Sequence, residues 1–509
     1  MNFRWSALLL MILGALTLSA CGGSSNNDNG QDEPETETPD TDEDNGDEED
    51  NEDGSDVPTT YTFPNADGEE TVSYTGQTKR HILIDDLVVE IKSLQEDVAQ
   101  DVQADLNFYF RFDAATSDDI TTQFNARDLG GMNILPENSG ELTYGAIASG
   151  KDLIGKIAGG DGQGNGEADK LINDEFFGWE DGLQADARPV DLVDHYFAAL
   201  AEEATDGEAP QIETVDGAVA LDTVTVDAHG RDYRQLTQKF LLGAVAFSQG
   251  TNDYLQADFA NMLEIEGDNT FTEGEHNWDE AFGYFGAARD YGDYTLDEIR
   301  NIGYKDTNGD DAIDIRSEYN FGNSTNCAKR DAGTADNASP TDYTTEVFEA
   351  FLAGRAILRA AAENGELTAD MQAELDAEIE TAALTWEKCV AATVVHYIND
   401  TLADIDAYQE GAFQDLGHYK NLAKHWSEMK GFALGLQFSP ESPFRADAEA
   451  LADLKDVLSL MGDAPVLPNG QQNGEAYEGG VEQYATDLMT ARDLMEAAYG
   501  FDAENVQNW

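Results

Sequence analysis

Apolar side chains recur at intervals of three to four residues over long stretches of this chain, and this spacing limits its fold more than any other feature. In the stretch 80–94, Leu83, Leu87 and Ile91 fall on one stripe of a helix. Similar stretches lie at 189–203, 231–249, 342–363, 369–403, 411–436, 447–461 and 478–499. Strict alternation is confined to short segments such as 221–226, so we predict a mostly helical, all-α fold.

The length of the chain predicts more than one hydrophobic core. A single core stops growing at about 250–300 residues, and this chain has 509, of which 41% are hydrophobic. Breaks rich in Gly, Pro and Asn lie at 158–166, 206–210, 320–340 and 464–474. We expect residues 61–509 to form two packed helical bundles, or lobes, at about 61–325 and 340–509.

The first sixty residues have the pattern of a bacterial lipoprotein leader. An apolar run, Trp5–Leu18, follows a short basic start and is too short to span a membrane. Ser19 and Ala20 then precede Cys21, as in a lipobox, which predicts a signal peptide at 1–20 and a lipid anchor on Cys21. The alternative is an ordinary secretory peptide with a Cys there by chance. Because Gly rather than Asp follows Cys21, the pattern favours the outer membrane, with its face left open.

The chain is strongly acidic, and its charges are unevenly distributed along the sequence. Lys and Arg number 28 against 103 Asp and Glu, giving a formal net charge of −75. The segment 21–60, rich in Gly, Ser, Asp and Glu, is expected to be a disordered linker between the lipidated Cys and the folded part. Nucleic acid is excluded as a partner, because its binding depends on Lys and Arg contacts to phosphate. Such a surface attracts cations instead.

The chain has three cysteines. With Cys21 assigned to the lipid, Cys327 and Cys389 remain. Outside the cytoplasm two thiols favour a disulfide, whereas the alternative is a pair of buried free cysteines.

Two pairs of His and Glu stand at helical spacing. His276 and Glu280 are four residues apart, and His425 and Glu428 are three apart, so the members of each pair would share a face of a helix. His418 lies two turns before His425 on the same face. Histidine with carboxylate on facing helices is how helical bundles build metal sites. The alternative is that each His only packs or forms hydrogen bonds locally.

The segment 306–318 resembles a calcium-binding loop of the EF-hand or dockerin kind. Its ligands would be the side chains of Asp306, Asn308, Asp310 and Asp314, the carbonyl of Ala312 and the carboxylate of Glu318. Asp311 stands where a Gly is usual, and Glu318 lies one residue later than the usual last ligand. The alternative is a solvated turn rich in Asp and Asn. Bound calcium would be structural.

Motifs of the common enzymes are missing from the sequence. It contains neither Gly-x-Ser-x-Gly nor His-Glu-x-x-His, and no Gly-x-Gly-x-x-Gly phosphate loop. We therefore expect a binding protein rather than an enzyme.

Several longer motifs together resemble a bacterial lipoprotein family of unknown function, domain-of-unknown-function family 4856. The motifs are Tyr61-Thr62-Phe63, Val72–Gln77, Glu275–Gly286, Asp306–Gly322 and Lys424–Phe438. The architecture is similar to that of the imelysins, which are secreted or lipid-anchored all-helical proteins of two related bundles. Imelysins are linked to iron acquisition and carry a His-x-x-Glu metal motif.

The imelysin resemblance implies a metal-ligand role for His425 and Glu428 only. The longer imelysin motif has Gly two residues before the His, where this chain has Ala423. Our first hypothesis is an outer-membrane-anchored protein whose His/Glu pairs bind a divalent or ferric cation, or its chelate. The alternative is a non-enzymatic interaction module of the cell surface, with calcium stabilising the loop 306–318.

Overall fold

The computed structural model describes residues 57–65, 67–94, 101–137, 140–162, 170–205, 209–409 and 411–509. These residues belong to one compact unit, Asp56–Trp509. The predicted signal peptide, the lipidation site Cys21 and the linker up to residue 56 lie outside the described residues.

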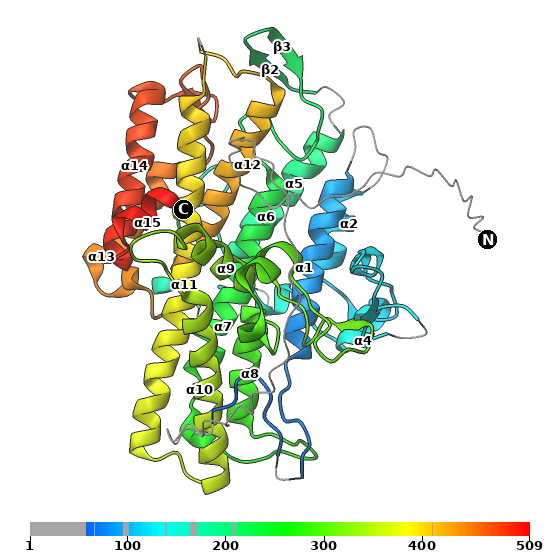
Figure 1. The fold of residues 1–509 in the computed structure, drawn as a ribbon. Helices are drawn as coiled ribbons and strands as arrows, with labels where there is room; N and C mark the ends of the chain where they lie inside the picture. The colour runs from blue at the N-terminus through cyan, green and yellow to red at the C-terminus, as the bar shows by residue number, and fades with distance from the viewer. Residues whose placement is uncertain are drawn as a thin grey trace, which may run out of the picture. The chain divides into compact units, whose positions relative to one another are not determined.

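The unit is built from helices, which confirms the predicted all-α class (Figure 1). Its longer helices are α1 (Thr75–Ser93), α5 (Pro189–Thr205), α8 (Glu273–Phe285), α9 (Gly322–Thr334), α10 (Tyr343–Asn364), α11 (Ala369–Asp406), α12 (Leu416–Ala433), α13 (Ala448–Met461) and α14 (Gly480–Tyr499). The shorter ones are α2 (Val102–Phe110), α3 (Ala114–Ser117), α4 (Tyr144–Ile147), α6 (Tyr233–Leu241), α7 (Ser248–Asn252) and α15 (Ala503–Asn508). A π-helical turn, Leu242–Phe247, joins α6 to α7. Every helical stretch predicted from apolar spacing overlaps one of these helices.

The long helix α11 packs against helices along most of its length. Its 38 residues extend over about 57 Å at the usual helical rise. In Figure 1 it runs beside α10 along its first half and beside α12 and α14 along its second half. Helices from either side of the expected lobe boundary also pack together, α8 on α10 and α6 on α12.

Local sequence signals set the ends of the helices that carry the candidate sites. At the start of α8, the Thr272 hydroxyl accepts from the Glu275 N–H, and the Glu275 carboxylate accepts from the Thr272 N–H. Gly286 ends this helix with φ +84°. Thr368 caps α11, and Asp415 caps α12 by accepting from the N–H of His418.

The segment 320–340 was expected to be a break but contains α9. Its Gly, Asn, Ser and Thr residues have low helix propensity. Packing overrides this preference, because α9 lies against α10 and α11. A disulfide between Cys327 of α9 and Cys389 of α11, with an S–S distance of 2.12 Å, joins the two helices.

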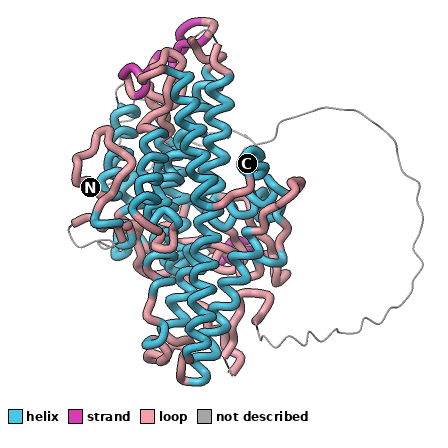
Figure 2. Tube along the Cα trace, turned by 90° about the vertical axis from the view of Figure 1, so that its left-hand side faces the viewer, coloured by secondary structure: helices cyan, strands magenta, loops and turns pink. Residues whose placement is uncertain are grey.

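In the part of the chain that the structure describes, the strands are short and form two-stranded sheets; Figure 2 shows them in magenta. The pairs are β1 (Asn133–Leu135) parallel to β4 (Ala312–Asp314), and the hairpins of β2 (Gln211–Thr214) with β3 (Gly217–Ala220) and of β5 (Gln471–Gln472) with β6 (Glu475–Ala476). The expected strand candidate 221–226 is not a strand, and the hairpin β2–β3 precedes it.

Large aromatic side chains form the centre of the core. Trp278, Trp386 and Trp426 are fully buried, one on each of α8, α11 and α12. The indole N–H of Trp278 donates to the carbonyl of Phe351, and that of Trp426 donates to the carbonyl of Met461. Within the part of the chain that the structure describes, no helix has the length and apolar character needed to cross a membrane.

Candidate functional site

The α8 motif forms a buried ion-pair network. Glu275 and Asp279 lie one turn apart and both face Arg355 of α10, at N–O distances of 2.6 and 2.8 Å. The Tyr61 hydroxyl donates to Asp279, and Arg355 also donates to the Thr71 hydroxyl. Burial raises the pKa of Asp279, and the Arg355 guanidinium opposes this shift. Since all these groups are used inside the protein, the network is structural.

The pair His276 and Glu280 lies on the neighbouring face of α8, at the edge of this network. Nε2 of His276 is 3.9 Å from Oε1 of Glu280. The imidazole stacks on the Phe271 ring, and the same Glu280 oxygen accepts a 2.7 Å hydrogen bond from Gln77 of α1. The His276 side chain keeps 35% of its surface exposed, so the pair lies at the surface between α8 and α1.

On α12, His425 and Glu428 face different partners. Nδ1 of His425 is 2.8 Å from Oδ2 of Asp404 on α11. The Glu428 carboxylate instead meets the ammonium groups of Lys239 on α6, at 3.5 Å, and Lys424, at 3.9 Å. Three residues along a helix are enough to turn a side chain from one neighbouring helix to another.

His425 belongs to a group of four side chains between α11 and α12, which we call the His–Asp cluster: His396, Asp400, Asp404 and His425. Oδ2 of Asp400 is 3.4 Å from Nε2 of His396 and 3.8 Å from Nε2 of His425. Side-chain exposure ranges from 14% for Asp404 to 33% for Asp400, so the cluster is partly exposed.

Burial and the neighbouring charges shift the pKa values of two members of the cluster. Burial and the guanidinium of Arg330 lower the pKa of His396 to about 2, which keeps this imidazole neutral. Burial also raises the pKa of Asp400, and the interaction with the neighbouring His425 opposes this shift. The Arg330 guanidinium thus acts on both His396 and Asp400.

Sequence reasoning missed three of the four cluster residues. His396, Asp400 and Asp404 are spaced four residues apart on α11, a spacing that places them on one face of a helix. This pattern is readable in the sequence. Its partner on α12 could not be read there, because the pairing of α11 with α12 is tertiary.

His418 has both ring nitrogens engaged. Nδ1 accepts from the N–H of Gln414 at 3.2 Å, and Nε2 lies 2.8 Å from the carbonyl oxygen of Asp404. A ring that accepts at Nδ1 donates from Nε2 and has no lone pair left for a metal.

The two predicted His/Glu pairs do not come together. The helix α8 packs on α1, α7 and α10, whereas α12 packs on α6 and α11. Figure 1 shows α8 well below α12. The fully buried Trp278 and Trp426 fill the core side of the two helices.

The loop 306–318 has the hydrogen bonds of a preformed turn. The Asp306 carboxylate accepts from the N–H groups of Gly309, Asp310 and Asp311. Asn308 accepts from Asp310 as well. Asp311, in the usual Gly position, adopts φ +61°, which Asp tolerates better than most residues.

Glu318, which lies one residue after the usual last ligand of a calcium loop, closes the segment 306–318. Its Oε1 accepts from the N–H and the hydroxyl of Thr307, and its Oε2 accepts from the N–H of Asp314. The Asp314 carboxylate pairs with the Arg316 guanidinium at 2.6 Å. The loop therefore brings its carboxylates to one turn, with Asp314 directed to Arg316.

Among the residues with described positions, no three His, Cys, Asp or Glu side chains are arranged so that they could hold a metal ion. The His–Asp cluster and the loop 306–318 are thus groups of suitable donors rather than formed metal centres.

Comparison with known proteins gives one match. The family model described as "Domain of unknown function (DUF4856)" matches residues 58–443. Neither a curated protein nor a solved structure matches the chain. The match covers α1 through α12 and hence both helices of the His–Asp cluster. Because it spans well over half of the sequence, the chain belongs to the DUF4856 family.

Proposed function

We propose that this protein is a lipid-anchored protein of the bacterial cell envelope that binds a divalent transition-metal ion, with iron among the candidates, at the His–Asp cluster. The observation that carries the proposal is the meeting of two imidazole Nε2 atoms, those of His396 and His425, at Oδ2 of Asp400, at 3.4 and 3.8 Å. In this proposal the His–Asp cluster takes the place of the predicted pair His425 and Glu428 as the metal site, because Glu428 faces Lys239.

The donor set fits such an ion. Two imidazoles and a carboxylate are ligands that zinc, iron and related divalent ions accept. Metal–ligand bonds of about 2.0–2.2 Å put neighbouring ligand atoms about 3.0–3.6 Å apart. The two distances to Oδ2 of Asp400, 3.4 and 3.8 Å, lie within and just above this range. Because the described side chains are not arranged to hold an ion as they stand, binding requires a rotation of the Asp400 carboxylate or of the His425 ring.

Asp404 would orient one of the ligands of such a site. A metal-bound imidazole usually donates its other ring N–H to a carboxylate or carbonyl, which fixes the tautomer and the ring orientation. Asp404 is placed for this role toward Nδ1 of His425, at 2.8 Å. The net charge of −75 also raises the local concentration of cations.

Calorimetric titration of full-length protein with Zn²⁺, Mn²⁺ and anaerobic Fe²⁺ tests the proposal. We expect one site that is lost in His396→Gln and in His425→Gln. His276→Gln is the matched control, because it removes an imidazole that is also four residues from a carboxylate but lies on α8. Equal binding by the wild type and His396→Gln would contradict the proposal.

The envelope location rests on the sequence around Cys21. We expect full-length protein made in a bacterial host to incorporate a palmitate analogue and to appear in the membrane fraction. Cys21→Ser is expected to abolish the labelling. Labelling that persists in Cys21→Ser would remove the anchor from the proposal.

The second candidate is an interaction module of the cell surface in which calcium stabilises the loop 306–318. The observation that favours it is Asp311 at φ +61° with Glu318 closing the loop. A ligand at 100 times its Kd stabilises by about 2.7 kcal/mol, so calcium should raise the melting temperature of the wild type and not of Asp310→Asn. This candidate fails if calcium leaves the wild-type melting temperature unchanged.

A further inference from the structure

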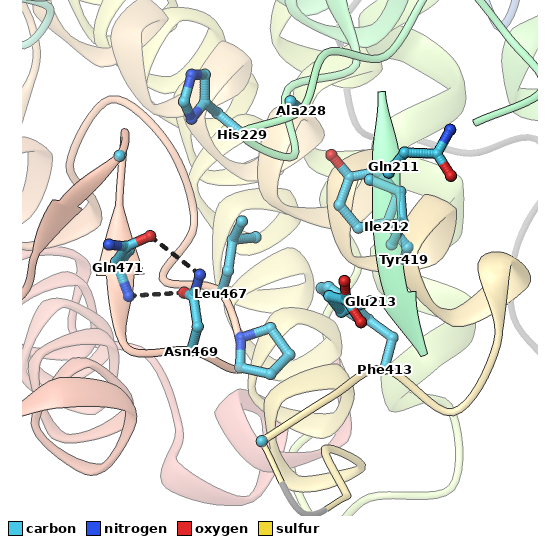
Figure 3. A pocket seen from close by; sticks show the side chains of 13 residues that line it. Gln211, Ile212, Glu213, Ala228, His229, Phe413, Tyr419, Leu467, Asn469 and Gln471 are labelled. Carbon is cyan, nitrogen blue, oxygen red and sulfur yellow. Dashed lines mark hydrogen bonds between the residues drawn. The ribbon is translucent and has the colours of Figure 1, made fainter. Parts of the chain in front are cut away.

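A cavity of about 250 Å³ lies between β2, the start of α12 and the loop 467–474 (Figure 3). Its inner wall is apolar, formed by side chains such as Ile212, Phe413, Leu467 and Pro468. Its volume is slightly below the lower end of the range for ligand sites, about 300 Å³, so the cavity suits a small molecule. None of the residues of the His–Asp cluster lines it.

The polar side chains that line the cavity include one carboxylate, that of Glu213. Glu213 and His229 line it, together with the amides of Gln211, Asn469 and Gln471. No Lys or Arg is among the lining residues that the structure describes. Glu213 is exposed, and within the described ranges its carboxylate forms no hydrogen bond or ion pair. An anion would meet the Glu213 carboxylate here, with only the imidazole of His229, and no Lys or Arg, to compensate it.

The backbone around the cavity is held in place. Phe413 N–H donates to the Glu213 carbonyl at 3.2 Å, which fixes β2 against the segment before α12. On the opposite side, Asn469 and Gln471 form two hydrogen bonds of 3.0 Å with each other, drawn as dashed lines in Figure 3. A preformed site binds without the free-energy cost of ordering its loops.

We propose that this cavity binds a small organic amine, whose ammonium group pairs with Glu213 and whose apolar body lies against Ile212, Leu467 and Pro468. The amides at the rim supply hydrogen bonds to any polar substituent. A preference for an amine over an acid of the same shape follows from the single unpaired carboxylate and from the acidic protein around it.

The test is a series of three probes with the same apolar body: phenethylamine, 2-phenylethanol and phenylacetate. Each is titrated into full-length protein and followed by ligand-observed NMR. We expect the amine to bind about two- to fivefold more tightly than the alcohol, the range for an exposed ion pair, and the acid to bind more weakly than both. In Glu213→Gln the amine should bind no better than the alcohol.

Asp216→Asn is the matched control. It removes one negative charge from the turn of the same hairpin, and Asp216 does not line the cavity. We expect this variant to keep the preference for the amine. A second variant, Leu467→Ala, should weaken the amine and the alcohol equally. No saturable binding of phenethylamine at 10 mM, or an equal loss of preference in Glu213→Gln and Asp216→Asn, would overturn the proposal.

Discussion

Nδ1 of His425 lies 2.8 Å from Oδ2 of Asp404. A carboxylate only accepts hydrogen bonds, so this contact places the ring proton on Nδ1. In the neutral ring the lone pair is then on Nε2, the atom that faces Asp400 at 3.8 Å. One contact between α11 and α12 thus sets the tautomer that a metal ligand needs.

Asp404 is predicted to act as a positioning residue for metal binding. Asp404→Asn keeps the shape of the side chain and removes its charge, so it should weaken binding of Zn²⁺ by about 10- to 100-fold. The control Asp406→Asn changes an exposed Asp on the same helix and should leave the Kd unchanged. Calorimetric titration measures both. Equal affinities of Asp404→Asn and Asp406→Asn would contradict the role of Asp404.

The buried network on α8 predicts a large loss of stability when its cation is removed. Arg355→Met removes the nearest cation from two fully buried carboxylates, Glu275 and Asp279, a change that costs about 3–5 kcal/mol. Arg359→Met, which removes a more distant and partly exposed Arg, should cost much less. Urea unfolding followed by circular dichroism compares the two variants. Similar unfolding midpoints would show that the network contributes little.

Removal of the disulfide is also predicted to cause a large loss of stability. Cys327 and Cys389 are 62 residues apart in sequence, and closing a loop of this length stabilises by about 4 kcal/mol on the chain-entropy model. The double variant Cys327→Ser and Cys389→Ser should therefore melt at a lower temperature than the wild type. A reducing agent should lower the melting temperature of the wild type only. If it lowers both equally, its effect does not act through this bond.

Glu387 of α11 predicts a pH dependence of stability. It is fully buried, and burial raises its pKa from 4.5 to about 7, although hydrogen bonds from the hydroxyls of Ser442 and Tyr499 lower it. The folded state therefore keeps this proton to higher pH than the unfolded chain does. The wild type loses stability as the pH rises from about 4.5 through about 7, by about 3 kcal/mol in all.

The isosteric variant Glu387→Gln lacks this titration and keeps an acceptor for the Tyr499 hydroxyl, which lies 2.7 Å from Oε1 of Glu387. The variant should exceed the wild type in stability at pH 8, and the difference should shrink toward pH 5. Urea unfolding at both pH values measures it. A difference that grows toward pH 5 would have the wrong sign.

Apolar spacing predicted the helices because it reports directly which face of a helix is buried. It gave α10, α11, α13 and α14 nearly to their ends. It could not give α9, whose polar residues have low helix propensity and are held by the disulfide and by α11. The hairpin β2–β3 was also not predicted from the sequence. Asp216 followed by Gly217, which adopts φ +108°, is nevertheless a recognisable turn signal.

The candidate site was only partly accessible from the sequence. Spacing on one helix indicated both His425 and Glu428, and the resemblance to the imelysins implied a metal-ligand role for the two. The neighbours of each depend on which helices lie beside α12, so neither Asp404 nor Lys239 could be named as a partner beforehand. The imelysin-like architecture, the lipid anchor and the role of iron stay predictions.

The most direct test of metal binding is crystallographic. Crystals of the protein soaked in Zn²⁺ and measured on both sides of the zinc absorption edge locate the ion by its anomalous signal. We predict a peak about 2.0–2.1 Å from Nε2 of both His396 and His425 and about 2.0–2.2 Å from a carboxylate oxygen of Asp400. Saturating zinc with no anomalous peak at the His–Asp cluster would contradict it.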